Sequence, residues 1–257
     1  MPRYLLIPVC LQRRSKKRIS KLLTSIKESH RDISGGWLRP AVFGAMDGLV
    51  SNLALMVGVA GGSAAVGASG SQSVILAGIA GLLAGAFSMA AGEYTSVESQ
   101  SELAAAEVDR EMQELKKDPD GEINELAQMF QEQGMSEETA LKAAKEISQD
   151  QEKAIALHSR LEFGVDVNDL PKGTVAGIAS FLAFGIGAFI PLIPYFFGAS
   201  GIIPTIIISL IGLFGLGALV SLVTIRTWYF SAFRQLFIGA GAALVTWFLG
   251  TLVGGIL

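Results

Sequence analysis

Residues 111–125 read EMQELKKDPDGEINE and carry two glutamate pairs on either side of a short Asp-Pro-Asp-Gly sequence. The pairs are Glu111 with Glu114 and Glu122 with Glu125, and a spacing of three places both carboxylates of a pair on one helix face. Residues 118–121 are typical of a turn, because Pro presets φ and Gly permits a positive φ. If two helices fold back there, four carboxylates converge, and like charges that close repel unless a cation lies between them. The stretch therefore predicts a divalent-metal site.

The charged residues are segregated along a chain of 257 residues that is 51% hydrophobic, with a mean hydropathy of +0.48. Of the 20 Lys and Arg, ten lie in residues 1–40 and eight in residues 93–172, while 20 of the 23 acids lie in residues 93–169. A soluble domain does not separate its charges in this way. We therefore predict an all-α integral membrane protein with a basic arm and an acidic middle.

Five apolar blocks are long enough for a helix to span a bilayer, which takes about 20 residues. They cover about residues 41–61, 74–94, 173–197, 202–224 and 236–257. The predicted domains are a basic N-terminal arm (1–40), spans one and two (41–94), a cytosolic helical metal-binding domain (95–165) and spans three to five (173–257). Pro191 and Pro194 predict an irregular end to the third span.

Orientation follows from the positions of Lys and Arg, which favour the cytosolic side. With five spans, all of these residues fall on one side of the membrane. The N-terminus and the acidic domain are then cytosolic and the C-terminus is outside. A bacterial plasma membrane and a eukaryotic vacuole both fit, because the sequence shows no organelle signal.

The acidic domain is predicted to be a three-helix bundle between spans two and three. Its helices are expected over residues 95–117, 122–133 and 136–163. Gly134 is the expected residue after the second helix, Ser136 the expected N-cap of the third, and Gly164 the expected stop.

Asp47 is the one acid away from the ends of an apolar block, where a charge is costly and usually functional. The alternative interpretation is that Asp47 is protonated and hydrogen-bonds to Ser51 or Asn52 without a role in transport. Met89 in the second span is a candidate soft metal ligand; the alternative is that it only packs against neighbouring helices. Glu93 at the inner end of that span is a candidate to pass metal or protons between the acidic domain and the pore; the alternative is a solvated carboxylate at the membrane interface.

His158 and Glu162 lie four residues apart on one face of the third predicted helix, a spacing that suits a transition-metal half-site. The alternative for His158 is an ordinary surface histidine, and the alternative for the glutamates is an ordinary solvated helix face. Phosphate-binding loops, a nucleophile elbow and Glu-x-x-His motifs are absent from the sequence. Use of ATP and oxidase chemistry are therefore not expected, and the protein is predicted not to be an enzyme.

From residue 40 to the end, the sequence resembles the vacuolar iron transporter family. The resemblance rests on FGAMDGLVSNLALMVGVAGG (43–62), AGAFSMAAGEYTSVESQSEL (84–103), ELKKDPDGEINELAQMFQEQGMS (114–136) and ASFLAFGIGAFIPLIPYFF (179–197). It implies five spans, a cytosolic three-helix metal-binding domain, a homodimer and exchange of cytosolic Fe²⁺ for protons.

The resemblance also implies roles for individual residues. It places the pore aspartate at Asp47 and the pore methionine at Met89. The four glutamates of the metal-binding domain fall on Glu111, Glu114, Glu122 and Glu125. The family's Met-x3-Glu falls on residues 158–162, where His158 replaces Met and makes the metal preference of this chain an open question.

The sequence thus predicts proton-coupled export of Fe²⁺ from the cytosol, with Mn²⁺, Zn²⁺ or Co²⁺ as other cargoes. The expected partners are divalent metals, protons, the lipid bilayer and a second copy of the chain. No permanently bound cofactor and no nucleic acid are expected. The alternative is a membrane-tethered divalent-metal sensor or buffer that does not transport.

Overall fold

The computed structural model describes residues 36–67, 71–221 and 226–256, which form helices and turns with no strand among them. Five helices are long and apolar enough to cross a membrane, as the sequence predicts. They are α2 (Leu38–Ala65), α3 (Ser71–Lys117), α7 (Gly173–Phe189) with its continuation, α9 (Ile203–Val220) and α10 (Trp228–Gly254). The predicted basic arm lies outside the described residues except for positions 36–40, and the first span already begins within those positions.

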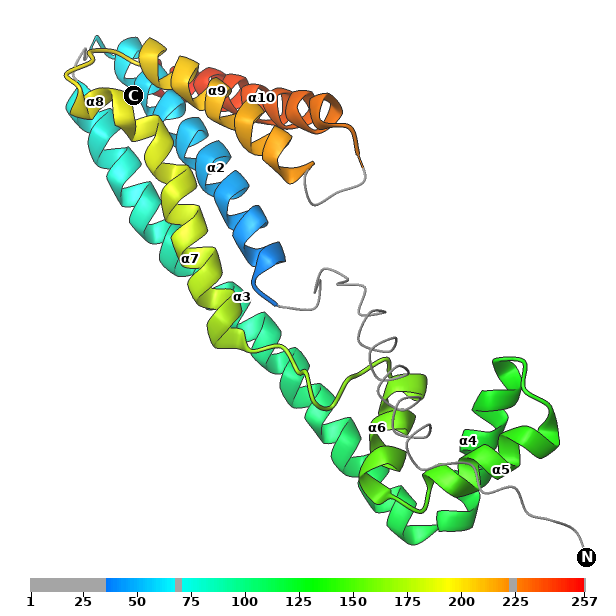
Figure 1. The fold of residues 1–257 in the computed structure, drawn as a ribbon. Helices are drawn as coiled ribbons and strands as arrows, with labels where there is room; N and C mark the ends of the chain where they lie inside the picture. Colours follow the sequence, from blue (N-terminus) through cyan, green and yellow to red (C-terminus); the bar gives the residue numbers. More distant parts are fainter. Residues whose placement is uncertain (1–35, 68–70, 222–225, 257) are drawn as a thin grey trace, which may run out of the picture. The chain divides into compact units, whose positions relative to one another are not determined.

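Helix α3 joins the second span to the acidic domain without a break (Figure 1). The sequence prediction divided it at residues 94 and 95, where the composition changes from apolar to acidic. Residues 95–117 contain neither Gly nor Pro and are rich in Ala, Glu and Leu, which favour helix. Nothing in that stretch stops the helix at the membrane boundary.

The third span ends irregularly, as its two prolines predict. After α7 the chain forms the 3₁₀ helix η1 (Ile190–Leu192) and the short helix α8 (Ile193–Phe196). Pro191 has no N–H to donate to the Gly187 carbonyl, and that carbonyl accepts instead from the Ile190 amide. The tighter turn is therefore a direct result of the proline.

Helix α2 packs against α7 and α10, and also against α3 and α9. A Cβ added to Gly48 would lie 2.2 Å from the Phe184 carbonyl oxygen, and one added to Gly187 would lie 2.1 Å from that of Ala45. Glycine is therefore required for α2 and α7 to approach this closely. On another face of α2, Leu49, Leu53 and Val57 form a core with α9 and α10.

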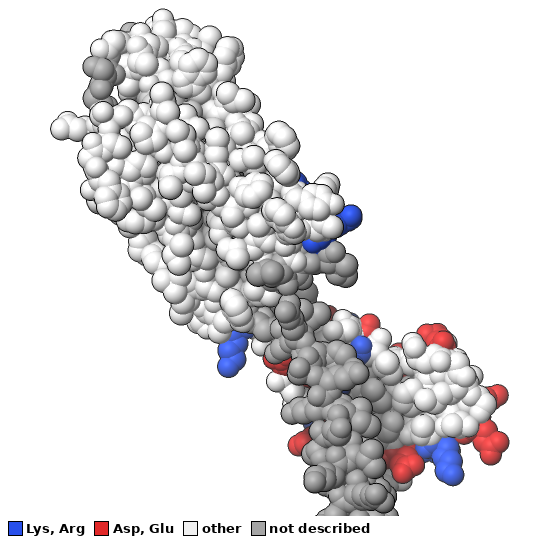
Figure 2. Space-filling view, turned by 45° about the horizontal axis from the view of Figure 1, so that its top comes forward, with Lys and Arg blue, Asp and Glu red and all other residues white. Residues whose placement is uncertain are grey.

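The outward faces of these helices are apolar. Leu76, Ile186 and Phe237 are each about 70% exposed in the isolated chain. Figure 2 shows the surface of the membrane-spanning helices as almost entirely uncharged, with acidic and basic atoms gathered over the acidic domain. Such a surface is stable where lipid covers it.

The acidic domain contains the end of α3 followed by α4 (Pro119–Glu132), α5 (Glu137–Ile147) and α6 (Gln151–Glu162). The predicted single helix over 136–163 is therefore wrong, because it is broken between α5 and α6. At the break the Asp150 carboxylate accepts a hydrogen bond from the Lys153 amide and starts a new helix. The expected helix-ending glycines are confirmed, since Gly134 has φ +96° and Gly164 has φ +68°.

Candidate metal centre

The turn between α3 and α4 is shorter than the sequence indicates. Asp118 is the N-cap of α4, its carboxylate accepting from the Gly121 amide at 3.0 Å, and Pro119 occupies the first turn. Asp120 and Gly121 consequently belong to the helix itself. The chain reverses at one capping residue, which brings the glutamates of α4 back toward those of α3.

Three side chains meet in the interior of the acidic domain. Nδ1 of His158 lies 3.0 Å from Oε1 of Glu111 and 3.8 Å from Oε2 of Glu122. One ligand atom from each residue falls within a group whose members are all within 4.8 Å of one another. His158 is 0% exposed, Glu111 3% and Glu122 9%. These three side chains, called here the buried triad, are therefore neither a surface histidine nor a solvated acidic face.

Three polar atoms of the buried triad make no hydrogen bond of ordinary geometry among the described residues. They are Oε1 of Glu111 and both ring nitrogens of His158, although Nδ1 lies only 3.0 Å from that oxygen. Buried polar atoms nearly always have a partner, because an unpaired one costs free energy. A divalent cation suits these ligands, since carboxylate oxygen and imidazole nitrogen together bind iron, zinc and similar metals.

Burial raises the pKa of both carboxyls in the triad. The pKa of Glu111 rises to about 6, through burial first and then through the charges of Glu162, Glu114 and Glu125. The pKa of Glu122 rises to about 7, through burial first and then through the charges of Glu111 and Glu125, with His158 acting the other way. Such shifts are typical of carboxylates held together for binding or catalysis.

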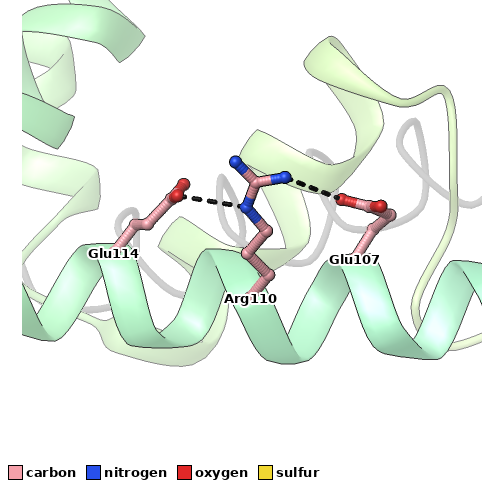
Figure 3. Close-up of polar contacts among 3 residues, drawn as sticks. All are labelled: Glu107, Arg110 and Glu114. Carbon is pink, nitrogen blue, oxygen red and sulfur yellow. Dashed lines mark hydrogen bonds and ion pairs between the residues drawn. The ribbon is translucent and has the colours of Figure 1, made fainter.

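The other three predicted ligands, Glu114, Glu125 and Glu162, surround the buried triad without joining it. Burial, followed by the charges of Glu125 and Glu114, raises the pKa of Glu162 above its usual value. Glu114 is held by an ion pair, in which Nε of Arg110 lies 3.2 Å from its Oε1 (Figure 3). The predicted ligands thus divide into the buried triad and three further carboxylates, called here the outer carboxylates, that interact with it electrostatically.

A second candidate site lies among the spans. A cavity of about 300 Å³ lies between α2, α3 and α7. Asp47 and Met89 both line it, and Ser51 donates a hydrogen bond to Oδ1 of Asp47 at 2.6 Å. The lining residues are Asp47, Ser51, Asn52 and Leu55 of α2, Gly81, Gly85, Ser88 and Met89 of α3, and Phe184 of α7. Glu93, one helical turn after Met89, is partly buried and is not among the lining residues.

A family model described as the VIT family matches residues 38–251. The chain belongs to the VIT family. Over 199 residues it is 35% identical to the vacuolar iron transporter of Acanthamoeba castellanii, an alignment that covers 73% of this chain and 70% of that protein. Over 223 residues it is 28% identical to vacuolar iron transporter 1 of Arabidopsis thaliana, covering 86% and 87% of the two chains.

VIT family membership and the five apolar helices together show a multi-pass integral membrane protein. The VIT family is a family of transporters, not of enzymes. The family match covers the spans and the acidic domain alike, since it runs from the start of α2 into α10.

Two residues beside these sites make contacts that the sequence does not predict. Arg110 lies three residues after Glu107 and four before Glu114, a helical spacing that could have revealed both ion pairs. The sequence offers Asn52 only as a partner for Asp47, but its amide donates a hydrogen bond to the Ala188 carbonyl of α7. No spacing rule within α2 indicates that contact.

Arg110 places a resident positive charge beside the outer carboxylates of this VIT-family protein. We expect Arg110→Gln to raise divalent-metal affinity by about two- to tenfold, because it frees Glu114 from its ion pair and removes a charge that repels an incoming cation. The effect is small because solvent screens charges at this exposed position. Isothermal titration with Mn²⁺ measures the change, with Lys142→Gln on α5 as the control. A lower affinity in Arg110→Gln would mean that the arginine supports the site.

The raised pKa values of Glu111 and Glu122 predict how the stability of the metal-free protein changes with pH. Both carboxyls have a pKa of 4.5 in the unfolded chain. The folded protein therefore keeps a proton on Glu111 up to about pH 6 and on Glu122 up to about pH 7, where the unfolded chain has lost both. These two groups therefore make the metal-free protein less stable as the pH rises through that window. Metal needs the deprotonated carboxylates and offsets this loss.

We accordingly expect Mn²⁺ to raise the Tm of the detergent-solubilised protein more at about pH 8 than at about pH 5. Thermal unfolding with and without Mn²⁺ at the two pH values measures this. An equal rise at both values would contradict binding at the buried triad.

Proposed function

We propose that this protein exports Fe²⁺ from the cytosol across its membrane in exchange for protons. The observation that carries the proposal is the cavity between the spans, where a carboxylate and a thioether line the same space. An acid inside a membrane-spanning helix is costly and is kept for transport or proton transfer. The vacuolar iron transporters that the chain resembles give the cargo.

The acidic domain would capture the metal. In this proposal Glu111, Glu122 and His158 form the inner ligands, and the surrounding carboxylates raise the local concentration of cations. Metal binding would relieve the repulsion among the buried carboxylates, which the free protein relieves by holding protons. Capture is thus coupled to proton release on the cytosolic side.

Glu93 would pass the metal from the acidic domain to the cavity. It lies on α3 between the two sites, about 27 Å along the helix from Glu111 and about 6 Å from Met89, at 1.5 Å per residue. A carboxylate at this position offers a hard oxygen ligand between the acidic domain and the cavity.

Asp47 would hold the cation in the membrane and release it on protonation. The Ser51 hydroxyl occupies one lone pair of Oδ1 and leaves the second carboxylate oxygen for a cation. A proton arriving from the opposite side competes with the metal for this carboxylate and drives release. Met89 adds a soft ligand that favours Fe²⁺ over Mg²⁺ or Ca²⁺.

The proposal includes an arrangement in the membrane. The N-terminus and the acidic domain are cytosolic and the C-terminus is outside, since this places all Lys and Arg on one side. The membrane is a bacterial plasma membrane or a eukaryotic vacuole, and the protein is a homodimer. Mn²⁺, Zn²⁺ and Co²⁺ are further cargoes that the same carboxylate and imidazole ligands accept.

A metal sensor or buffer without transport is the second candidate. It is favoured by the completeness of the buried triad, which lies wholly in the acidic domain and needs no residue of the spans. The membrane cavity with Asp47 opposes it, because a sensor has no need of a carboxylate there.

Uptake into proteoliposomes separates the two candidates. Fe²⁺ uptake is measured with and without an imposed pH gradient, with Mn²⁺ in parallel. Uptake that depends on the gradient supports exchange with protons, and the two rates give the preferred cargo. Metal binding without uptake under either condition would support the sensor.

A further inference from the structure

Asn52 is the most deeply buried polar residue of the membrane cavity. It lies on α2 and is 2% exposed. Its amide nitrogen donates a hydrogen bond to the Ala188 carbonyl oxygen of α7 at 2.6 Å. The side chain is therefore fixed in orientation by a neighbouring span and not by its own helix.

That hydrogen bond determines which end of the amide meets α7. The opposite rotation would bring two carbonyl oxygens together with no donor between them. Oδ1 of Asn52 consequently points away from Ala188, and it lies against α3, where a Cβ added to Gly81 would come within 2.8 Å of it. A glycine at position 81 leaves the room that this oxygen occupies.

Oδ1 of Asn52 has no hydrogen-bond partner among the described residues. A buried carbonyl oxygen without a partner is unfavourable, so this atom is poised to accept a donor or a cation. Gly81, against which the oxygen lies, is itself part of the cavity wall. A small separation of α2 from α3 at this glycine would uncover the oxygen to the cavity contents.

Asn52 lies farther along the cavity than Asp47. Five residues of helix separate them, about 7.5 Å along α2. On α3, which runs antiparallel, the neighbouring Gly81 lies about 12 Å before Met89, on the side away from the acidic domain. A cation entering past Met89 and Asp47 would meet the Asn52 oxygen next.

We propose that the side-chain carbonyl of Asn52 is a cation ligand of the membrane step, which accepts a divalent metal from Asp47 when α2 and α3 separate at Gly81. This inference rests on the proposed transport function. A neutral oxygen attracts the cation less strongly than a carboxylate does, which allows the cation to leave again. As a hard ligand it also favours Fe²⁺ and Mn²⁺ over softer metals such as Cd²⁺.

Two substitutions distinguish a ligand from a merely structural residue. Asn52→Leu keeps the volume and removes both the oxygen and the amide. Asn52→Asp keeps an oxygen ligand and removes the amide donor to Ala188. Gln235→Leu is the matched control, because it removes a buried amide of α10 outside the cavity.

The experiment measures Mn²⁺ and Cd²⁺ uptake by each full-length variant in proteoliposomes. We expect Asn52→Leu to lose at least about tenfold in Mn²⁺ uptake relative to Cd²⁺, because Asp47 and the softer Met89 remain. Asn52→Asp and Gln235→Leu should keep the ratio of the unsubstituted protein. A Mn²⁺/Cd²⁺ uptake ratio unchanged in Asn52→Leu, or a ratio lowered as far in Asn52→Asp as in Asn52→Leu, would overturn the proposal.

A binding measurement separates failure of this inference from failure of the transport proposal. Mn²⁺ binding is measured by electron paramagnetic resonance in protein whose Glu111, Glu122 and His158 are replaced by Ala. Binding that Asn52→Leu abolishes and Asn52→Asp retains supports the ligand role even if no transport is seen. Binding unaffected by Asn52→Leu would overturn that role, whatever the transport result.

Discussion

Asp47→Ala is expected to reduce gradient-driven Fe²⁺ uptake to the rate of protein-free liposomes. The substitution removes the carboxylate that lines the membrane cavity and the acceptor of the Ser51 hydrogen bond. In the proposed mechanism the cation then loses the one charged group among the described residues that line the cavity, and the proton loses the carboxylate for which it competes. Metal titration of the same protein should still show binding at the acidic domain, because the buried triad is unchanged.

Glu146→Ala is the matched control for Asp47→Ala. It removes an exposed carboxylate of α5 and should leave both uptake and binding unchanged. Asp47→Asn adds a second comparison, since it keeps the shape and an oxygen but cannot take up a proton. Uptake retained in Asp47→Ala would remove Asp47 from the transport pathway.

His158→Ala is expected to lower metal affinity of the acidic domain by more than about 100-fold. Loss of a group that only supports a metal ligand costs 10- to 100-fold, and a direct ligand should cost more. The substitution also removes the imidazole nitrogen that lies close to both Glu111 and Glu122. Co²⁺ titration followed by its visible absorption measures the affinity and reports on nitrogen ligation.

Two further variants complete the test of the buried triad. Glu122→Gln should show a similar loss with the fold retained, because the amide fills the same space. Glu138→Gln, which changes a carboxylate in the first turn of α5, should bind Co²⁺ as the unsubstituted protein does. Nearly unchanged affinity in His158→Ala would mean that the imidazole is not a metal ligand.

The sequence is a good guide to the spans, because each is a long apolar run and the bilayer thickness sets its length. It predicts their ends less well. Helix α3 continues past the point where its composition changes, and the third predicted bundle helix breaks at Asp150. Helix caps depend on a few side-chain contacts, and a periodic pattern does not contain these.

The candidate ligands could be predicted from spacing, but their grouping could not. Glu111 and Glu114 are equivalent by spacing, yet one is buried against His158 and the other pairs with Arg110. Which residue of an equally spaced pair is buried depends on how α3 and α6 contact each other in the tertiary structure. The hydrogen bond from Asn52 to Ala188 joins residues 136 positions apart and is likewise invisible to local patterns.

The most direct test of proton–metal exchange records the pH inside proteoliposomes when Fe²⁺ is added outside, with no pH gradient imposed. Protein oriented with its acidic domain outward should move Fe²⁺ inward and protons outward, so the lumen should become alkaline in step with Fe²⁺ entry. The same trace should stay flat for Asp47→Ala. Fe²⁺ entry without any change in lumenal pH would contradict the exchange.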